Sequence, residues 1–446
     1  MRRVLIALVA LVVGSQVCFA DKVVLRDGRS FTGRIVERTN EQVVFEVQKY
    51  GGKMKYKMTF PAKDIASLTE GAVKEEPPKP DAAAKGGPLS LPAEPKCPPI
   101  VSHNGPTYYV VPLKGVVGET VVASVLEKSF ADAVNRKPTV VILVIDSPGG
   151  SVGEVDKILE VIRSHARKLR LVVYVRNSAL SAAAITAMAV KEVYMHPSGI
   201  IGAATAFEIA PTGVPREIAE KFQSVWRATA RSCAEAGGHE SLLAEAMVDK
   251  GMQLWVSVQD GRKIISERAG GPDARMITRR GKLLTMTASE AVDCGLALGV
   301  AEDYEKLREL LKIDSWTECE GHAKALLEHR EAVIKAVTAE FERLRERFLD
   351  AMRQAEATNP VNFTYMFDSQ TGQLTPESQK KWQQHSVTCL RFLERAEDSV
   401  RKAGGLGREY PELLAGDPDF LRRIENAIKS MRETIARRAY RKSVTE

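Results

Sequence analysis

The chain has 446 residues, of which 44% are hydrophobic, and its formal net charge at pH 7 is +7. This length is too great for one ordinary domain, and the apolar share supports a sizeable core. The charge is modest for the length, so bulk electrostatics gives no reason to expect a nucleic-acid partner. The six cysteines form no CxxC pair and no metal-ligand spacing, so we expect neither a disulfide framework nor a metal or cofactor.

Residues 1–20 have the form of a secretory signal peptide. Arg2 and Arg3 precede an apolar run over residues 4–13, and Ala20 ends an acceptable cleavage site before Asp21. The run is short for a membrane span. We therefore expect the mature protein to be secreted across the inner membrane and to be periplasmic or otherwise extracytoplasmic. The alternative is an uncleaved leader that anchors the chain in the membrane.

Residues 21–70 alternate apolar and polar side chains, with hairpin signals at residues 27–28 and 51–52. This pattern predicts a small antiparallel β-barrel similar to SH3-like or Sm-like modules. Such a module would bind or position a partner, or serve only as a structural appendage. Residues 71–106 are rich in Pro, Ala and Lys, which predicts an extended linker and a domain boundary.

Strand and helix patterns alternate over residues 107–313. Strands are predicted over 108–113, 140–145, 171–175 and 192–195, and amphipathic helices within 118–134 and over 152–165. The run 140–145 is continuously apolar, as in strands that are buried on both faces. Repeated β-α units predict an α/β fold with a largely parallel sheet.

Helical periodicity dominates residues 316–446, especially over 322–357, 376–403 and 419–442, and predicts a helical hairpin or bundle. The last of these helices is strongly basic. Its face either contacts anionic lipid or an acidic partner, or is simply solvated. The basic residues are Arg422, Arg423, Lys429, Arg432, Arg437, Arg438, Arg441 and Lys442.

A candidate nucleophile lies where the predicted strand 171–175 leads through a turn of small residues into an apolar helix ending near Val190. Ser181 stands in this turn, and a serine at a sharp strand-to-helix turn can act as a nucleophile, although such a serine can equally be a helix N-cap. The turn after strand 140–145 contains Gly149 and Gly150, whose amides could point at a developing oxyanion. The amide of Ala182 is placed to be the other donor.

A serine nucleophile needs a base. The nearby histidines fit badly, because His196 precedes a proline after a strand and His239 lies in a Gly-Gly-His-Glu turn. Lys221 is better placed, near the start of a helix that follows a flexible segment, although a solvated surface lysine would give the same pattern. A lysine base must be neutral, which requires desolvation because a free lysine titrates near about 10.4.

The stretch from about Tyr108 to Leu311 resembles the ClpP/crotonase-like serine protease domain of the NfeD family, which is akin to signal peptide peptidase A. The segments ILVIDSPGGSVGE and NSALSAAAITAMAVKEVYMHPSGIIGAA carry the most specific part of the match. The resemblance implies a Ser-Lys dyad in which Ser181 is the nucleophile and Lys221 the general base, 221 − 181 = 40 residues later. It places the oxyanion loop at residues 149–150. Family members usually carry glycine where this chain has Ala183.

The resemblance further implies a serine endopeptidase that acts on a protein or peptide substrate, in particular on membrane-associated or apolar segments. It also implies a membrane-protein partner and a homo-oligomer of two or more copies. Two other functions stay open. One is a catalytically inactive scaffold with the same fold, in which Lys221 would be exposed or turned away from Ser181. The other is acyl-CoA chemistry, which the secretory leader disfavours. Ser147 and Ser178 are alternative hydroxyls.

Overall fold

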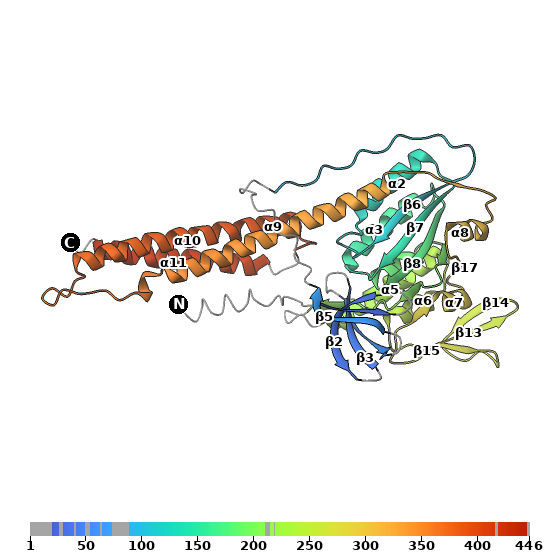
Figure 1. Cartoon of the computed structure of the whole chain (residues 1–446). Helices are drawn as coiled ribbons and strands as arrows, with labels where there is room; N and C mark the ends of the chain where they lie inside the picture. The colour runs from blue at the N-terminus through green and yellow to red at the C-terminus, as the bar shows by residue number, and fades with distance from the viewer. Residues whose placement is uncertain are drawn as a thin grey trace. The chain divides into compact units, whose positions relative to one another are not determined.

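The computed structural model describes residues 20–25, 30–39, 42–49, 54–62, 65–73, 89–209, 215–217, 219–414 and 418–443 (Figure 1). The predicted leader up to residue 19 and residues 74–88 of the predicted linker lie outside the described residues. The chain divides into two compact units. One comprises residues 92–332 with 48–55, and the other comprises residues 1–47, 56–91 and 333–446.

The predicted β module contains five strands. They form one sheet in the order β4-β3-β2-β1-β5, and β1 pairs with both β2 and β5 in antiparallel fashion. Val23 and Val43 are buried, as the alternating pattern requires. The strands are β1 (Ala20–Leu25), β2 (Ser30–Arg38), β3 (Gln42–Lys49), β4 (Met54–Pro61) and β5 (Ile65–Val73).

The α/β region is built on an eight-stranded sheet, and the predicted parallel fold is observed. The main strand order is β16-β10-β8-β7-β6-β18, with β9 beside β8 and β17 beside β9. Every pairing in it is parallel except that between β10 and β16. The strands are β6 (Thr107–Lys114), β7 (Val140–Ser147), β8 (Leu171–Leu180), β9 (Glu192–Met195), β10 (Ile200–Gly202), β16 (Thr285–Thr287), β17 (Gly299–Val300) and β18 (Thr317–Glu318).

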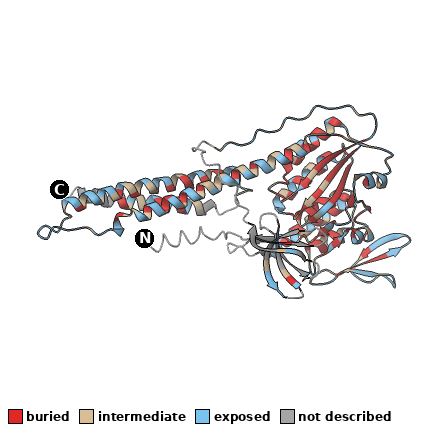
Figure 2. Cartoon of the chain, in the orientation of Figure 1, coloured by how far each residue is buried: buried red, intermediate tan, exposed pale blue. Residues whose placement is uncertain are grey.

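Helices cover both faces of this sheet, which explains why β7 is apolar at successive positions. Val141, Leu143 and Ile145 face a large cluster shared with helices α2 to α7, whereas Val140 and Ile142 face a smaller cluster with α8. Figure 2 shows the resulting buried strands at the centre of the domain. The helices are α2 (Ala123–Arg136), α3 (Val152–His165), α4 (Ala182–Met188), α5 (Glu220–Gly237), α6 (Ser241–Val248), α7 (Ala288–Asp293) and α8 (Tyr304–Leu310).

Two small sheets are inserted beside the main one. Strands β11 (Phe207–Ile209) and β12 (Pro215–Glu217) form an antiparallel pair just before α5. Strands β13 (Leu254–Gln259), β14 (Arg262–Ser266) and β15 (Arg275–Thr278) form a three-stranded antiparallel sheet with β13 in the middle.

The second half of the predicted linker is extended and held by side chains of the α/β region. Arg136 donates to the carbonyls of Pro98 (2.6 Å) and Pro99 (3.2 Å) and pairs with Asp132 at 2.8 Å. Burial alone would raise the pKa of Asp132, but the hydrogen bonds from Arg136, the His322 amide and the hydroxyl of Tyr109 lower it. The ion pair is buried, so its polar partners are needed to offset desolvation.

Residues 333–443 contain long helices, as the periodicity predicts. Helices α9 (Ala323–Ala357) and α10 (Pro376–Glu409) form a hairpin, and α11 (Pro418–Ser443) packs along α10. Their apolar stripes meet in a cluster that contains Met352, Leu393 and Ile428. Among the described helices, none combines the length and the apolarity that a membrane crossing demands.

Candidate active site at the carboxyl edge of the sheet

The sheet brings the two predicted catalytic turns together. Strands β7 and β8 are parallel neighbours, and Ser147 lies opposite Ala179, so the turns that follow both strands open at the same edge. Ligands and reacting groups collect at this edge in open α/β sheets. Asn177 donates to Asp146 at 2.9 Å and Ser178 donates to the same carboxylate at 3.2 Å, which ties the two strand ends together.

Ser181 stands at the junction of β8 and α4 with a strained backbone. Its φ is 54° and its ψ is −127°, a combination that residues other than glycine rarely adopt. Such a conformation costs about 1–3 kcal/mol and persists only where the surroundings enforce it. Here the amide of Ser181 donates to the carbonyl of Gly202 at 2.9 Å, and no side-chain cap bond engages its hydroxyl. The hydroxyl is therefore presented by a turn of the nucleophile-elbow kind.

Gly149 is pressed against this turn. A Cβ added to Gly149 would lie 2.4 Å from the Cβ of Ser181 and 2.9 Å from the amide nitrogen of Ala182, and the φ of Gly149 is +91°. Gly150 is equally confined, because a Cβ there would lie 2.1 Å from the carbonyl oxygen of Val117. Only glycine fits at either position. The Gly-Gly turn thus lies in van der Waals contact with Ser181.

The three amides that were predicted to bind an oxyanion differ in whether they already donate a hydrogen bond. The amide of Gly149 donates to the hydroxyl oxygen of Ser147 at 3.1 Å. Within the part of the chain that the structure describes, the amides of Gly150 and Ala182 donate to no acceptor. Ala182 is the first residue of α4, where backbone N–H groups lack helical partners and the helix dipole favours negative charge.

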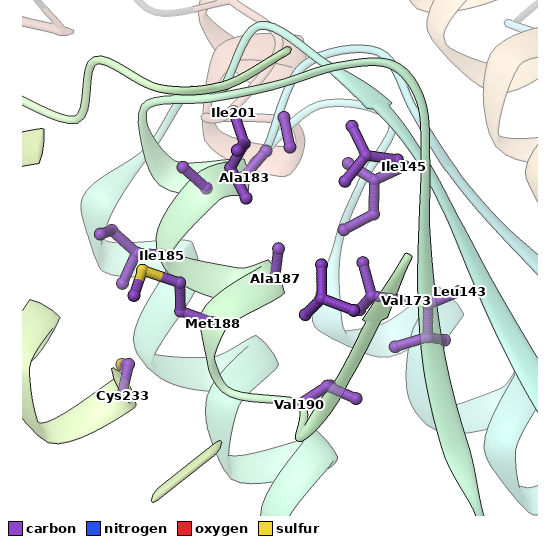
Figure 3. Packing of buried hydrophobic residues seen from close by; sticks show 14 of the residues in the cluster. Leu143, Ile145, Val173, Ala183, Ile185, Ala187, Met188, Val190, Ile201 and Cys233 are labelled. Carbon is purple, nitrogen blue, oxygen red and sulfur yellow. The ribbon is translucent and has the colours of Figure 1, made fainter. Parts of the chain in front are cut away.

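The methyl group of Ala183 does not lie at the surface of the site. Ala183 is 3% exposed and belongs to the same apolar cluster as Ile145 and Ile201. Figure 3 shows it among these side chains, with Ile185, Ala187 and Met188 of α4 below. All seven residues of α4 are buried. The alanine that replaces the usual glycine of the family therefore fills core volume.

Lys221 lies in the first turn of α5, and its side chain is exposed. No hydrogen bond joins it to Ser181, and among the described residues it has no ion-pair partner. The structure therefore does not show the predicted dyad in a hydrogen-bonded state.

The helix that carries Lys221 is nevertheless hydrogen-bonded to residues 202–206, the segment that also pairs with the backbone of Ser181. The carbonyl of Gly202 accepts the Ser181 amide, and the indole of Trp226 donates to the carbonyl of Ala204 at 2.6 Å. Gln223 donates to the carbonyl of Ala206 at 2.8 Å. The four residue steps from Gly202 to Ala206 span at most about 14 Å. No pattern in the sequence predicts these backbone contacts.

A comparison with protein families identifies the domain that carries this site. Residues 107–318 match the family described as "NfeD1b, N-terminal domain". We refer to these residues as the NfeD1b-type domain. A curated relative, "Membrane protein NfeD1b" of Bacillus subtilis (strain 168), is 29% identical over 201 residues, which cover 45% of this chain. The matched stretch spans 40% of that relative's length.

Solved structures of membrane proteases are similar to the NfeD1b-type domain at low identity. A lysine-to-alanine mutant of the 1510-N membrane-bound stomatin-specific protease with a substrate peptide is 19% identical, covers 51% of this chain and 98% of its own, and has a TM-score of 0.40. The Pyrococcus horikoshii membrane protease specific for a stomatin homolog is 20% identical, covers 46% of this chain and 79% of its own, and has a TM-score of 0.32.

The two histidines of the NfeD1b-type domain that could compete as bases have other roles. His196 contacts the hydroxyl of Ser198 at 2.7 Å, and its amide pairs with Val175, six residues before Ser181 along β8. His239 contacts the carbonyl of Val190 at 2.9 Å, beyond the far end of α4. Among the described residues, no group of three or more His, Cys, Asp or Glu side chains is arranged to hold a metal ion.

Proposed function

We propose that the NfeD1b-type domain is a serine endopeptidase in which Ser181 is the nucleophile and Lys221 the general base. Lys221 takes the proton from the Ser181 hydroxyl as its oxygen attacks the scissile carbonyl. The scissile C–N bond then breaks, and the protonated Lys221 returns the proton to the leaving amine, which departs. Water, deprotonated by the neutral Lys221, then hydrolyses the acyl-enzyme and regenerates Ser181. The family match and the serine-protease neighbours support the peptidase class, and the geometry of Ser181 supports the nucleophile.

The observation that carries this proposal is the strained backbone of Ser181. A helix N-cap has no need of a φ of 54° and a ψ of −127°, and here the side chain forms no cap bond. Strain of this kind clusters at functional sites, because it presents a side chain that an ordinary turn would bury or turn aside. The N-cap alternative therefore accounts for less of the structure than the nucleophile does.

We assign the oxyanion to the amides of Gly150 and Ala182. Both are without an acceptor in the described structure, whereas Ser147 already accepts the amide of Gly149. Gly149 then contributes by its lack of a side chain, which lets the turn lie against Ser181. Two amides aimed at the developing charge typically contribute several kcal/mol of transition-state stabilisation.

Lys221 is proposed to reach Ser181 when a peptide occupies the edge of the sheet. Hydrogen bonds between catalytic groups are often long or unmade before substrate binds. A peptide laid over Ser181 and the start of α5 would also remove water from the amine and favour its neutral form. The hydrogen bonds of Gln223 and Trp226 hold α5 near the segment that pairs with Ser181, which limits the distance that the Lys221 amine must move.

The proposed substrate is an apolar protein segment. Phe222 and Val225, which are 61% and 62% exposed, stand beside Lys221 on α5 and offer an apolar surface next to the proposed base. The Pyrococcus horikoshii protease is specific for a stomatin homolog, and we extend to this chain only the class of membrane-associated protein segments. We propose that the reaction takes place outside the cytoplasm, in a homo-oligomer.

A catalytically inactive scaffold is the second candidate, and one observation favours it. It predicts an exposed Lys221 without a bond to Ser181, and the structure has both features. The scaffold does not account for the strain at Ser181 or for the two amides without acceptors. The two candidates differ in whether the hydroxyl reacts.

Labelling with a fluorophosphonate probe separates them. The full chain should be labelled on Ser181, Ser181→Ala should abolish labelling, and Lys221→Ala should slow it at least about 100-fold. Ser124→Ala and Lys168→Ala, at exposed positions of α2 and of the turn after α3, are the matched controls, and both should be labelled at the wild-type rate. Absence of labelling in a chain whose circular dichroism shows it to be folded would establish the scaffold instead.

A further inference from the structure

The loop that joins α9 to α10 exposes a concentration of large apolar side chains. Met366 is 72% exposed and Phe367 61%, and Val361 and Phe363 of the same loop are 49% and 40% exposed. Residues 358–375 contain a single charged residue, Asp368. Figure 2 shows this loop as exposed at the end of the α9–α10 hairpin. Scattered surface apolar residues need no explanation, but a group of this size marks a contact surface.

The loop is held in shape by its own polar groups, which leaves the apolar side chains outside. The carboxylate of Asp368 accepts from the amides of Gln370 (3.0 Å) and Thr371 (2.8 Å), and the amide of Asp368 donates to the carbonyl of Gln373 at 2.7 Å. The amide of Met366 donates to the hydroxyl of Ser378 at 2.9 Å. Met366 and Phe367 are thus presented by an ordered turn.

Aromatic contacts fix the base of the loop to the first turns of α10. The rings of Phe363 and His385 are stacked with centroids 3.8 Å apart, and Tyr365 meets Trp382 edge-on at 5.1 Å. The hydroxyl of Tyr365 contacts His385 at 3.0 Å. Tyrosine and tryptophan rings beneath exposed apolar residues are typical of the interface between membrane and water.

The basic end of α11 lies at the same end of the bundle. Arg432 pairs with Glu397 and lies 3.9 Å from Glu394, so α11 runs antiparallel to α10 toward the loop. Ten further residues at 1.5 Å each carry α11 about 15 Å onward, to the level of residues 384–387 of α10. Residues 437–442 contain four basic residues and no acidic one. Figure 1 shows that α11 ends at the loop end of these helices.

We propose that this end of the helical bundle is a membrane-contact element that inserts Met366 and Phe367 into the surface of an anionic bilayer. The four basic residues of α11, with Lys380 on α10, supply the electrostatic attraction, whereas Lys381 is paired with Glu377 at 2.7 Å. Apolar insertion and a polybasic segment are each weak alone and bind stably together. A bilayer fits better than a protein groove because the apolar side chains are exposed and the basic stretch 437–442 ends the helix that runs toward the same end of the bundle.

Partitioning of the full chain onto lipid vesicles tests this proposal. Vesicles of phosphatidylcholine in which a third of the lipid is phosphatidylglycerol should bind the chain, and vesicles of phosphatidylcholine alone should bind it less. The double variant Met366→Ser and Phe367→Ser should bind about tenfold more weakly. Its matched control is Val258→Ser and Met276→Ser, which removes side chains 63% and 48% exposed on β13 and β15 and should bind like wild type.

Two variants that each lose four positive charges test the electrostatic contribution to vesicle binding. Replacement of Arg437, Arg438, Arg441 and Lys442 by Gln should weaken binding and flatten its dependence on salt. Replacement of Arg268, Arg279, Arg280 and Lys282 by Gln removes equal charge from exposed positions of the β13–β15 region. The proposal would be overturned if both sets of replacements weakened vesicle binding equally, or if neither set weakened it.

A local probe distinguishes insertion of this loop from anchoring by the apolar leader, which all variants share. The Met366→Trp variant should show fluorescence quenching by brominated lipids, whereas Met276→Trp should show none beyond wild type. Absence of quenching at position 366 contradicts the proposal. A change in oligomeric state of the Met366→Ser and Phe367→Ser variant without lipid would also contradict it, by assigning the loop to a contact between copies or with a protein.

Discussion

Ser181 and Lys221 differ in how firmly the surrounding structure fixes them. Ser181 is fixed by a strained turn, by the Gly202 carbonyl and by close packing of Gly149, on a helix that is buried throughout. Lys221 lies exposed in the first turn of α5, after the β11–β12 pair. Folding alone therefore fixes the position of Ser181, whereas the proposed role of Lys221 requires a bound substrate to bring it to the hydroxyl.

The largest stability effect is expected where the packing around Ser181 is tightest. Gly149→Ala places a methyl group 2.4 Å from the Cβ of Ser181 at a φ of +91°. Overpacking and strain together should lower the free energy of unfolding by about 3 kcal/mol. Urea unfolding of the full chain measures this value. Gly153→Ala in α3 is the control, because its nearest neighbour atom is 3.9 Å away, and it should not destabilise the chain.

Removal of the backbone strain at Ser181 should stabilise the protein, and loss of the hydroxyl should abolish the proposed peptidase activity. Ser181→Gly releases about 1–3 kcal/mol of backbone strain, which exceeds the extra chain entropy of glycine, about 0.5–1 kcal/mol. Ser181→Gly should therefore be about 1 kcal/mol more stable than Ser181→Ala, which retains the strain. Equal unfolding midpoints for the two variants would show that the turn is not strained, and the case for the nucleophile would lose its main support.

The architecture of the α/β region was predictable, because its strands are apolar runs buried on both faces. The β8 strand was predicted to end at Val175 but continues to Leu180. The residues in between read as a turn, yet β7 and β10 pair with them. Pairing partners of this kind are tertiary information that a local pattern does not contain.

The site was predictable only in part. That the turns after β7 and β8 meet follows from parallel topology, so the proximity of residues 149–150 to Ser181 was foreseeable. Three features of the site were not foreseeable, because each depends on packing between distant segments. They are the dihedral angles of Ser181, the hydrogen bond from the Gly149 amide to Ser147, and the exposure of Lys221. The Ser181/Lys221 assignment stays a prediction.

A smaller effect is expected at the opposite end of α4, where His239 contacts the carbonyl of Val190. Burial lowers the pKa of His239 below 6.5, against the opposing effect of that hydrogen bond. The unfolded chain therefore binds more protons just below pH 6.5, and stability is lost as pH falls through that window. The slope cannot exceed about 1.4 kcal/mol per pH unit for one group. Unfolding midpoints of wild type and His239→Gln across this range should converge at low pH.

The smallest stability effect should be that of Lys221→Ala. An exposed side chain without an ion-pair partner among the described residues contributes little, so the change should stay within about 0.5 kcal/mol. A destabilisation above about 1 kcal/mol, twice the usual range for a surface substitution, would mean that Lys221 has a structural role and would remove the contrast with Ser181.

The most direct measurement is the pH dependence of Ser181 labelling by a fluorophosphonate, followed by mass spectrometry of the modified peptide. If Lys221 removes the serine proton, the labelling rate rises with pH, because only the neutral amine can accept it. Lys221→Ala should then lose this rise and label slowly at every pH, while Lys168→Ala keeps the wild-type profile. A Lys221→Ala variant with the wild-type rate and profile would contradict the account.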